Sequence, residues 1–231
     1  MKKVTVEVFT DADYTYLDGD EVAHALATVR ALSSCVEVMN RGRFIHFPPG
    51  YPAGIVEANR RMRLVRETDA QMLLTGREIV APSDNDGSRT TGLYVVESRL
   101  GIVSAATPSV MRTARHEFGH YLYEQGGIGG GEIDTDGHCH DRGCAMHARG
   151  SSHTERRLMV PKEVYCHAKQ LASGLQFPYD AAVYETVQVA DTVKYCAGCV
   201  ERLGYNAFVL ATEKDNPTGA AMLRSERGLM Y

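Results

Sequence analysis

His116, Glu117 and His120 form a His-Glu-x-x-His sequence. Two histidines four residues apart lie on one face of a helix, so both imidazoles can reach one metal ion. Glu117 lies about 100° further round the helix and can approach a metal-bound water without displacing a ligand. A carboxylate there can take a proton from the water and later pass it to a leaving amine. The pattern predicts a zinc peptidase, against the alternative of two ordinary histidines on a helix face.

The surrounding sequence places this motif inside a helix. Thr107 is typical of a helix N-cap, and Pro108 suits the first helical position. Gly126 and Gly127 are typical of the C-terminal end of a helix. Apolar residues recur at helical spacing between these signals, at Val110, Met111, Ala114, Phe118, Tyr121 and Leu122. We therefore expect an active-site helix over about residues 108–125.

A catalytic zinc usually takes three protein ligands and leaves one position open for water. We predict His138 as the third ligand, because Cys139 and Cys144 follow it closely. Asp134 and Asp136 compete for this role. The other candidate ligands downstream of the helix are Glu132, His140, His147 and Glu155.

The cysteines indicate a second metal site, because Cys139 and Cys144 have a later counterpart in Cys196 and Cys199. Four tetrahedral sulfurs are a favoured ligand set for structural zinc. Disulfides and unpaired core thiols are the competing interpretations. Residues 4–8 alternate in polarity and do not form the apolar run of a secretory signal. We therefore expect a cytoplasmic protein, in whose reducing surroundings paired cysteines more often hold metal.

In these residues the sequence resembles the archaemetzincin family of zinc metallopeptidases. The family pattern is His-Glu-x-x-His-x-x-Gly-x-x-His-Cys, four residues, Cys-x-Met, and a later Cys-x-x-Cys. The resemblance implies that His116, His120 and His138 bind a catalytic zinc, with Glu117 as the catalytic carboxylate and Met146 in a turn beneath the metal. It also implies a second zinc with four cysteine ligands, at Cys139, Cys144, Cys196 and Cys199.

The chain departs from the family pattern in the length of two segments. Residues 121–137 separate the second and third histidines, where the family has five residues, and Tyr123 replaces the usual glycine. Residues 147–195 separate the turn methionine from the last cysteine pair. The longer first loop costs only about 1 kcal/mol in closure entropy, which metal binding can offset. Its glycine-rich part, residues 126–131, is either a tolerated insertion or a flap over the substrate.

The strand and helix patterns predict one α/β (α+β) domain over residues 1–231, and the family resemblance implies a zincin or metzincin-like fold. We expect a mixed twisted sheet packed on the zinc-binding helix in residues 1–125, and a mostly helical part in residues 126–231. The predicted strands are residues 3–9, 35–39, 43–47, 71–74, 93–96 and 102–104. Four other helices are predicted. One begins at Asp20 and runs to about Leu32, and the others cover residues 53–66, 161–173 and 180–195.

Three further expectations concern connections and ends. Asn40 to Gly42 is predicted to be a turn between two strands, and residues 213–231 are expected to be poorly ordered. Residues 101–105 are the last strand before the zinc helix. The family resemblance implies that an edge strand at this place binds extended substrate by backbone pairing, and an ordinary interior strand is the alternative.

The composition narrows the functional classes. A chain of 231 residues that is 44% hydrophobic can bury one sizeable core without needing disulfides or a structural metal for stability. No run of about eighteen apolar residues is present, so we expect no membrane span. A net charge of −4 gives no electrostatic reason to expect nucleic-acid binding. We expect the chain to be a monomer, and the family resemblance implies that its partner is a peptide substrate.

The predicted function is zinc-dependent hydrolysis of peptide bonds with Glu117 as general base. The resemblance implies peptide substrates, with aminopeptidase-type trimming as one form. The alternative is a catalytically inactive two-zinc structural or protein-binding module, although zinc binding alone does not require Glu117. A tyrosine near the metal can stabilise an oxyanion, and the unranked candidates are Tyr121, Tyr123 and Tyr165.

Overall fold

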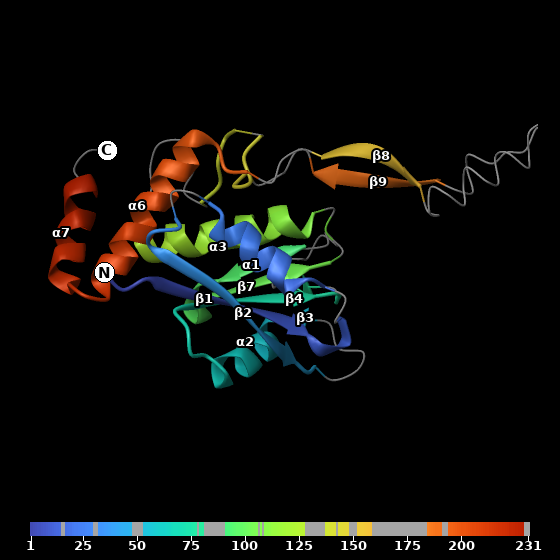
Figure 1. The fold of residues 1–231 in the computed structure, drawn as a ribbon, viewed down its shortest axis with the longest axis horizontal. Helices are drawn as coiled ribbons and strands as arrows, with labels where there is room; N and C mark the ends of the chain where they lie inside the picture. The colour runs from blue at the N-terminus through green and yellow to red at the C-terminus, as the bar shows by residue number, and fades with distance from the viewer. Residues whose placement is uncertain are drawn as a thin grey trace, which may run out of the picture.

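The computed structural model describes residues 1–14, 17–29, 32–47, 53–77, 79–80, 91–105, 107, 109–127, 137–141, 143–147, 152–158, 184–190 and 194–228. Five of the strands form one sheet in the order β2-β1-β4-β7-β6 (Figure 1). The first four strands are parallel, and β6 pairs antiparallel with β7 at one edge. Their bounds are β1 Val4–Asp11, β2 Val36–Ile45, β4 Ala70–Thr75, β6 Gly92–Val95 and β7 Leu100–Ser104. The predicted mixed sheet is confirmed.

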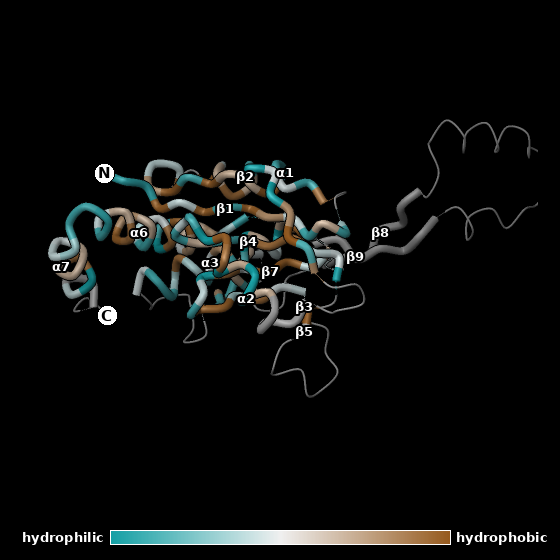
Figure 2. Tube along the Cα trace, turned by 90° about the horizontal axis from the view of Figure 1, so that it is seen from below, coloured by the Kyte–Doolittle hydropathy of each residue, from teal (hydrophilic) through white to brown (hydrophobic). Residues whose placement is uncertain are grey.

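Helices cover both faces of this sheet (Figure 1). The helices α1 (Gly19–Ala27) and α3 (Val110–Gly126) lie on one face, and α2 (Ile55–Leu64) lies on the other. Side chains alternate across a strand, so Val8 joins the core beneath α1 and α3, and Phe9 joins the core beneath α2. Figure 2 shows hydrophobic residues along β1, β4 and β7, between the helices on the two faces of the sheet. No described helix is long and apolar enough to cross a membrane.

Two small strand pairs and the C-terminal helices complete the described fold. The short strands β3 (Ala53–Gly54) and β5 (Ile79–Val80) are parallel, and β8 (Ser152–Leu158) pairs antiparallel with β9 (Tyr184–Ala190). The prediction of a helix over residues 180–195 is therefore wrong. In β9, Val187 and Val189 alternate with Thr186 and Gln188, and β-branched residues favour an extended backbone. The helix predicted over residues 161–173 and the polar segment 82–90 lie outside the described residues.

The turn predicted at Asn40 to Gly42 is also wrong, because β2 runs through these residues as one strand. Its pairing with β1 shifts register between Val8 and Thr10, and Gly42 has a φ of +65°. This is a bulge, in which glycine accommodates the left-handed conformation without strain. A hairpin is impossible here, since β2 pairs with the parallel strand β1.

Both helix starts lie two residues from the predicted positions. Asp18, not Asp20, caps α1, and its carboxylate accepts hydrogen bonds from two backbone N–H groups of the first turn. Ser109, not Thr107, caps α3 and accepts from the Arg112 N–H. The predicted stop of α3 is confirmed, since Gly127 adopts the left-handed conformation with a φ of 74°.

The strands predicted at residues 93–96 and 102–104 form a hairpin before α3, and the second of them takes the interior place that was the alternative to an edge strand. Strand β6 pairs with β7 through the register Leu93 to Ile102. Strand β7 also pairs with β4, so residues 101–105 lie inside the sheet and do not form its edge. Parallel pairing with β4 satisfies the second side of β7. Among the described strands, the sheet edge next to α3 belongs to β6.

The C-terminal helices α6 (Ala197–Glu213) and α7 (Pro217–Gly228) are attached to the rest of the molecule by ion pairs. Arg224 pairs with Glu213 and donates to the carbonyl of Gly126 at the end of α3. The expectation that residues 213–231 are poorly ordered is therefore wrong over α7. The contact between Arg224 and Gly126 was not readable from the sequence, because it joins residues 98 positions apart.

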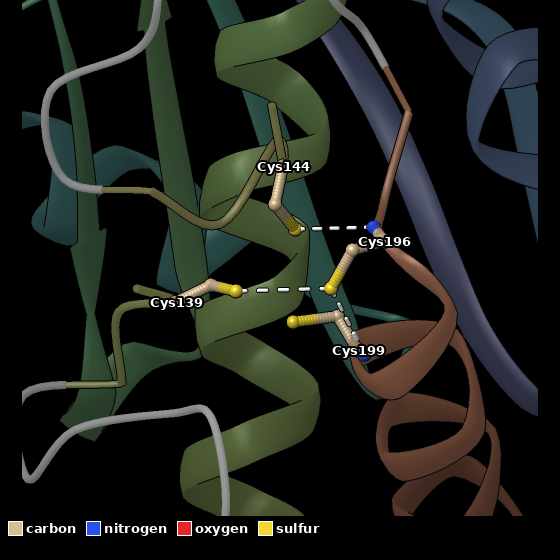
Figure 3. A group of neighbouring side chains, drawn as sticks. All are labelled: Cys139, Cys144, Cys196 and Cys199. Carbon is tan, nitrogen blue, oxygen red and sulfur yellow. Dashed lines mark hydrogen bonds between the residues drawn. The ribbon is translucent and has the colours of Figure 1, made fainter. Parts of the chain in front are cut away.

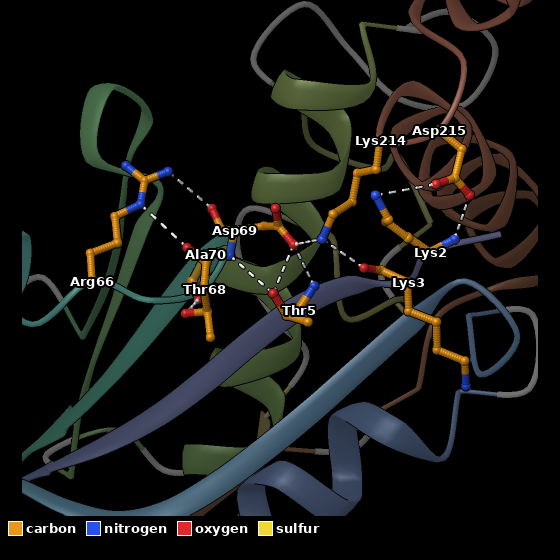
Figure 4. A network of polar contacts seen from close by, with 9 residues as sticks. All are labelled: Lys2, Lys3, Thr5, Arg66, Thr68, Asp69, Ala70, Lys214 and Asp215. Atoms are coloured by element: carbon orange, nitrogen blue, oxygen red, sulfur yellow. Dashed lines mark hydrogen bonds and ion pairs between the residues drawn. The ribbon is translucent and has the colours of Figure 1, made fainter.

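A second network fixes the end of α6 to the start of the sheet (Figure 4). Lys214 Nζ donates to Asp69 Oδ2 at 2.7 Å and to the Lys3 carbonyl at 2.8 Å. The same Asp69 oxygen accepts from the backbone N–H and the hydroxyl of Thr5. Helix α6 is thereby anchored to β1 and β4 at one end, while its other end carries two of the candidate ligands.

At the opposite ends of the strands, a buried guanidinium joins three of them. Arg77 Nε lies 2.6 Å from Asp11 Oδ2, which also accepts from the Thr75 hydroxyl. Ser104, the last residue of β7, donates to the Arg77 carbonyl. Arg77 also pairs with Asp13. This network holds the chain where it leaves the sheet for the active-site helix.

We expect Arg77→Gln to lower the free energy of unfolding by about 3 kcal/mol, because the buried Asp11 charge loses its partner. Urea denaturation measures the change. Lys2→Gln is the matched control, since Lys2 pairs with Asp215 on the surface and should matter by less than about 1 kcal/mol. Equal losses in the two variants would contradict the assignment.

Candidate metal centres

Three histidines converge at the middle of α3. His116 and His120 lie one turn apart on the helix, and His138 joins them from the following loop. Their candidate ligand nitrogens all lie within 4.8 Å of one another, and the Nε2 atoms of His116 and His120 are 3.1 Å apart. Two nitrogens bound to one tetrahedral zinc are separated by about 3.3 Å. The donor set and its spacing therefore fit a zinc ion.

Hydrogen bonding and burial prepare His116 for this role. Its Nδ1 lies 2.8 Å from the Ala145 carbonyl, which can only accept, so Nδ1 carries the proton. The Nε2 lone pair then faces the other two histidines. Burial lowers the pKa of His116 to about 4, against the opposing effect of the Ala145 hydrogen bond. The neutral imidazole is the form that binds a metal.

Gly137 turns the chain into the site immediately before His138. Its φ of +81° is disfavoured for other residues, and a Cβ there would lie 3.0 Å from Nδ1 of His120. Glycine at this position therefore lets the returning loop pass close to the helix. Among the competing ligands, His140 and His147 are not part of the histidine group. Residues Glu132, Asp134 and Asp136 and the side chain of Glu155 lie outside the described part of the chain.

Glu117 faces the sheet, away from solvent, and its side chain is among the buried polar groups of the chain. Burial raises the pKa of its carboxyl to about 8, and the positive charge of Arg112 acts in the opposite direction. The carboxyl lies against Gly92 of the edge strand. It therefore occupies a narrow, water-poor slot between α3 and β6.

Sequence reasoning missed Arg112, which joins the helix to the loop that follows the histidines. Its Nη2 donates to the His147 carbonyl at 2.8 Å. Burial lowers the pKa of Arg112, although the charges of Cys144 and Glu117 oppose the shift. The available signal was spacing, because Arg112 precedes His116 by one helical turn and shares its face.

Met146 lies directly beneath the histidine-bearing helix. It is fully buried, and a Cβ on Gly119 would overlap its sulfur. The carbonyl of Met146 accepts from the Cys139 N–H at 3.0 Å. The turn around Met146 can approach α3 this closely only because the motif carries glycine one position before its second histidine.

Four cysteines form a second group (Figure 3). Cys139 and Cys144 come from the loop after His138, Cys196 is the N-cap of α6, and Cys199 lies in its first turn. Figure 3 shows the sulfurs turned toward a common centre. All four are free thiols, and Cys139 and Cys196 have their sulfurs 3.7 Å apart. Sulfurs on a tetrahedral zinc are about 3.8 Å apart, so this group also fits the ion.

The electrostatics of the cysteine group favour a thiolate. The pKa of Cys144 is lowered, mainly because the Cys199 thiol donates to its sulfur. The backbone N–H groups of Cys196 and Met146 also donate to it, at 3.2 and 3.4 Å. The pKa of Cys139 is raised to about 12, mainly by burial. One stabilised thiolate among three neighbouring thiols, two of them buried, is an arrangement that a divalent cation would complete.

The tyrosine candidates differ in position. Tyr121 is buried and packs edge-on against Tyr94 at 6.3 Å between ring centroids. This places it in the core and argues against a role at the oxyanion. Tyr123 lies close to Gly137, immediately before His138. Tyr165 is outside the described residues.

Comparison with solved structures gives a match to the crystal structure of archaemetzincin from Methanopyrus kandleri. The match has a TM-score of 0.50 and 16% sequence identity, and it covers 88% of this chain and 95% of that chain. This chain has the archaemetzincin fold. No family profile matches the sequence, and no curated protein matches it either. The three-histidine and four-cysteine groups in this fold can each hold a metal ion.

We expect Gly119→Ala to destabilise the protein by about 1–3 kcal/mol and to weaken zinc retention, because the new methyl group displaces Met146. Thermal unfolding and zinc content after dialysis measure the two effects. Gly143→Ala is the control, since it lies in the same turn region and its Cβ would meet only Asp141 at 3.3 Å or more. A Gly119→Ala variant that behaves like this control would argue against close packing of Met146.

Proposed function

We propose that this protein is a zinc-dependent peptidase. His116, His120 and His138 would hold the catalytic zinc, which when bound polarises the scissile carbonyl and makes a water molecule more acidic. The observation that carries the proposal is the buried carboxyl of Glu117, which lies one residue along α3 from His116 of the three-histidine group. A site that only binds metal needs no carboxylate there. The archaemetzincin fold of the chain supports the same conclusion.

The role of Glu117 follows from its surroundings. Burial makes its carboxylate a stronger base than one in water, which suits removal of a proton from the attacking water. The protonated Glu117 can then give the proton to the nitrogen of the leaving amine. Arg112 keeps positive charge nearby and limits the rise in the pKa. Glu117 is thus able to accept and release a proton near neutral pH.

The open edge of β6 suits an extended peptide as substrate. The Ser104 N–H donates to the Thr91 carbonyl, so residues 91, 93 and 95 direct their backbone groups toward β7. Gly92 and Tyr94 alternate with them and direct theirs to the open side. A peptide added there as a further strand would lie next to Glu117. Aminopeptidase-type trimming is the narrower form of the proposal, and comparing free and acetylated peptide N-termini tests it.

The four-cysteine group would hold a second, structural zinc, at Cys139, Cys144, Cys196 and Cys199. We include residues 1–231 in a single peptidase domain, because α6 packs against α3 and the network at Lys214 fixes it to the sheet. A cytoplasmic monomer remains our expectation for the chain.

We expect Glu117→Gln to lower kcat for peptide hydrolysis by at least about 100-fold, because the amide cannot take the proton. Its zinc content should equal that of the wild type. Glu124→Gln is the control, an exposed carboxyl on the same helix whose loss should not change kcat. Unchanged hydrolysis in Glu117→Gln would place the base elsewhere. No hydrolysis by the wild type would favour the inactive two-zinc module.

Elemental analysis should find two zinc ions per chain, one for each ligand group. His138→Ala should lose one ion and all hydrolysis, and Cys196→Ser should lose the other ion and unfold at a lower temperature. His140→Ala is the control, since this exposed neighbour belongs to neither group and should keep both ions. Full zinc retention in His138→Ala would move the third ligand to another residue.

A further inference from the structure

The start of the edge strand β6 lies directly against the active-site helix. A Cβ built on Gly92 would overlap Oε1 of Glu117 and Cγ2 of Thr113, and would lie 3.1 Å from Cδ of Glu117. Gly92 is not among the described glycines with a positive φ, so its backbone suits any residue. Space, not backbone conformation, is what requires glycine here.

The groups around Glu117 leave its side chain little space to move. Its side chain is only 4% exposed. On the neighbouring strand β7, a Cβ on Gly101 would lie 3.3 Å from Cβ of Glu117, so two adjacent strands both approach this one side chain. Thr113 is itself held by a 2.8 Å hydrogen bond between its hydroxyl and that of Thr107. A methyl group at position 92 must therefore displace the carboxyl.

Gly101 differs from Gly92 in what a side chain would meet. Its Cβ would press on the sulfur and terminal methyl of Met72, at 2.8 and 2.9 Å. These atoms form the flexible end of a side chain and can move at small cost. At Gly92 the obstacle is the carboxyl oxygen that the proposed reaction uses. The constraint at Gly92 is thus tied to the chemistry of the site.

We propose that Gly92 is a positioning residue for Glu117, because its missing side chain leaves the slot that the carboxyl occupies. The N–H and C=O of Gly92 face the open edge of the sheet, where an extended peptide would pair. The same residue therefore fixes the separation between the general base and the main chain of the substrate. The catalytic part of this inference rests on the proposed peptidase function, and the steric part does not.

A double-mutant cycle on stability tests the steric part without any turnover. Gly92→Ala should lower the midpoint of thermal unfolding by about 4 °C or more in the wild type. In the Glu117→Ala background, where the slot is empty, the same substitution should have a clearly smaller effect. Leu93→Ala is the matched control, because Leu93 packs on the opposite face of the same strand and should be additive with Glu117→Ala. Additivity of Gly92→Ala would overturn the proposal.

Kinetics test the catalytic part. Gly92→Ala should lower kcat by about 10-fold or more while zinc content and KM change little, because the displaced base no longer meets the water. In the Glu117→Ala background it should cause no further loss of residual activity. An equal loss in both backgrounds, or a change confined to KM, would overturn the positioning role. An inactive wild type with a non-additive stability cycle would refute the peptidase proposal and leave the steric contact established.

Discussion

The packing of α3 on the sheet is the constraint on which both candidate centres depend. Phe118 and Leu122 lie fully buried in the core beneath the helix. This fixes the rotation of α3, and the 3.6-residue period then directs His116 and His120 away from the sheet. Glu117 is left facing the edge strand, in a position of low polarity. A helix rotated by one residue would exchange the surroundings of ligand and base, so core packing decides the chemistry of the motif.

The turn at residues 144–147 connects the two centres. Cys144 belongs to the sulfur group, while the carbonyl of the next residue, Ala145, accepts from His116. The N–H of Ala145 donates to the Lys194 carbonyl at 2.8 Å, just before Cys196. The long segment between the two cysteine pairs thus leaves and returns at nearly one point. An insertion with such closely fixed ends changes little in the packing of the turn, which explains why its length does not disturb either ligand group.

The sequence was sufficient for features that depend on local spacing. The stop of α3 and the strands at β6 and β7 follow from residue types at short separations. The cysteine group, which joins Cys139 to Cys196 over 57 positions, was expected from the spacing within its two pairs. The sequence was insufficient where pairing with a distant segment determines the structure. Strand β7 lies inside the sheet because it pairs with β4, and the bulge at Gly42 exists because β2 pairs with β1 in parallel. The cap of α1 was misplaced because Asp18 and Asp20 are equally good capping residues by type.

Three glycines determine how closely the surrounding segments pack against the candidate site. Gly92, Gly119 and Gly137 each lie against a functional side chain, namely Glu117, Met146 and His120 respectively. Only Gly137 of the three has a positive φ, so the other two are required by their neighbours and not by the backbone. A ligand motif specifies which atoms meet the metal. The glycines specify how closely strand, turn and loop can approach the helix, and that separation sets the room left for Glu117, Met146 and His120.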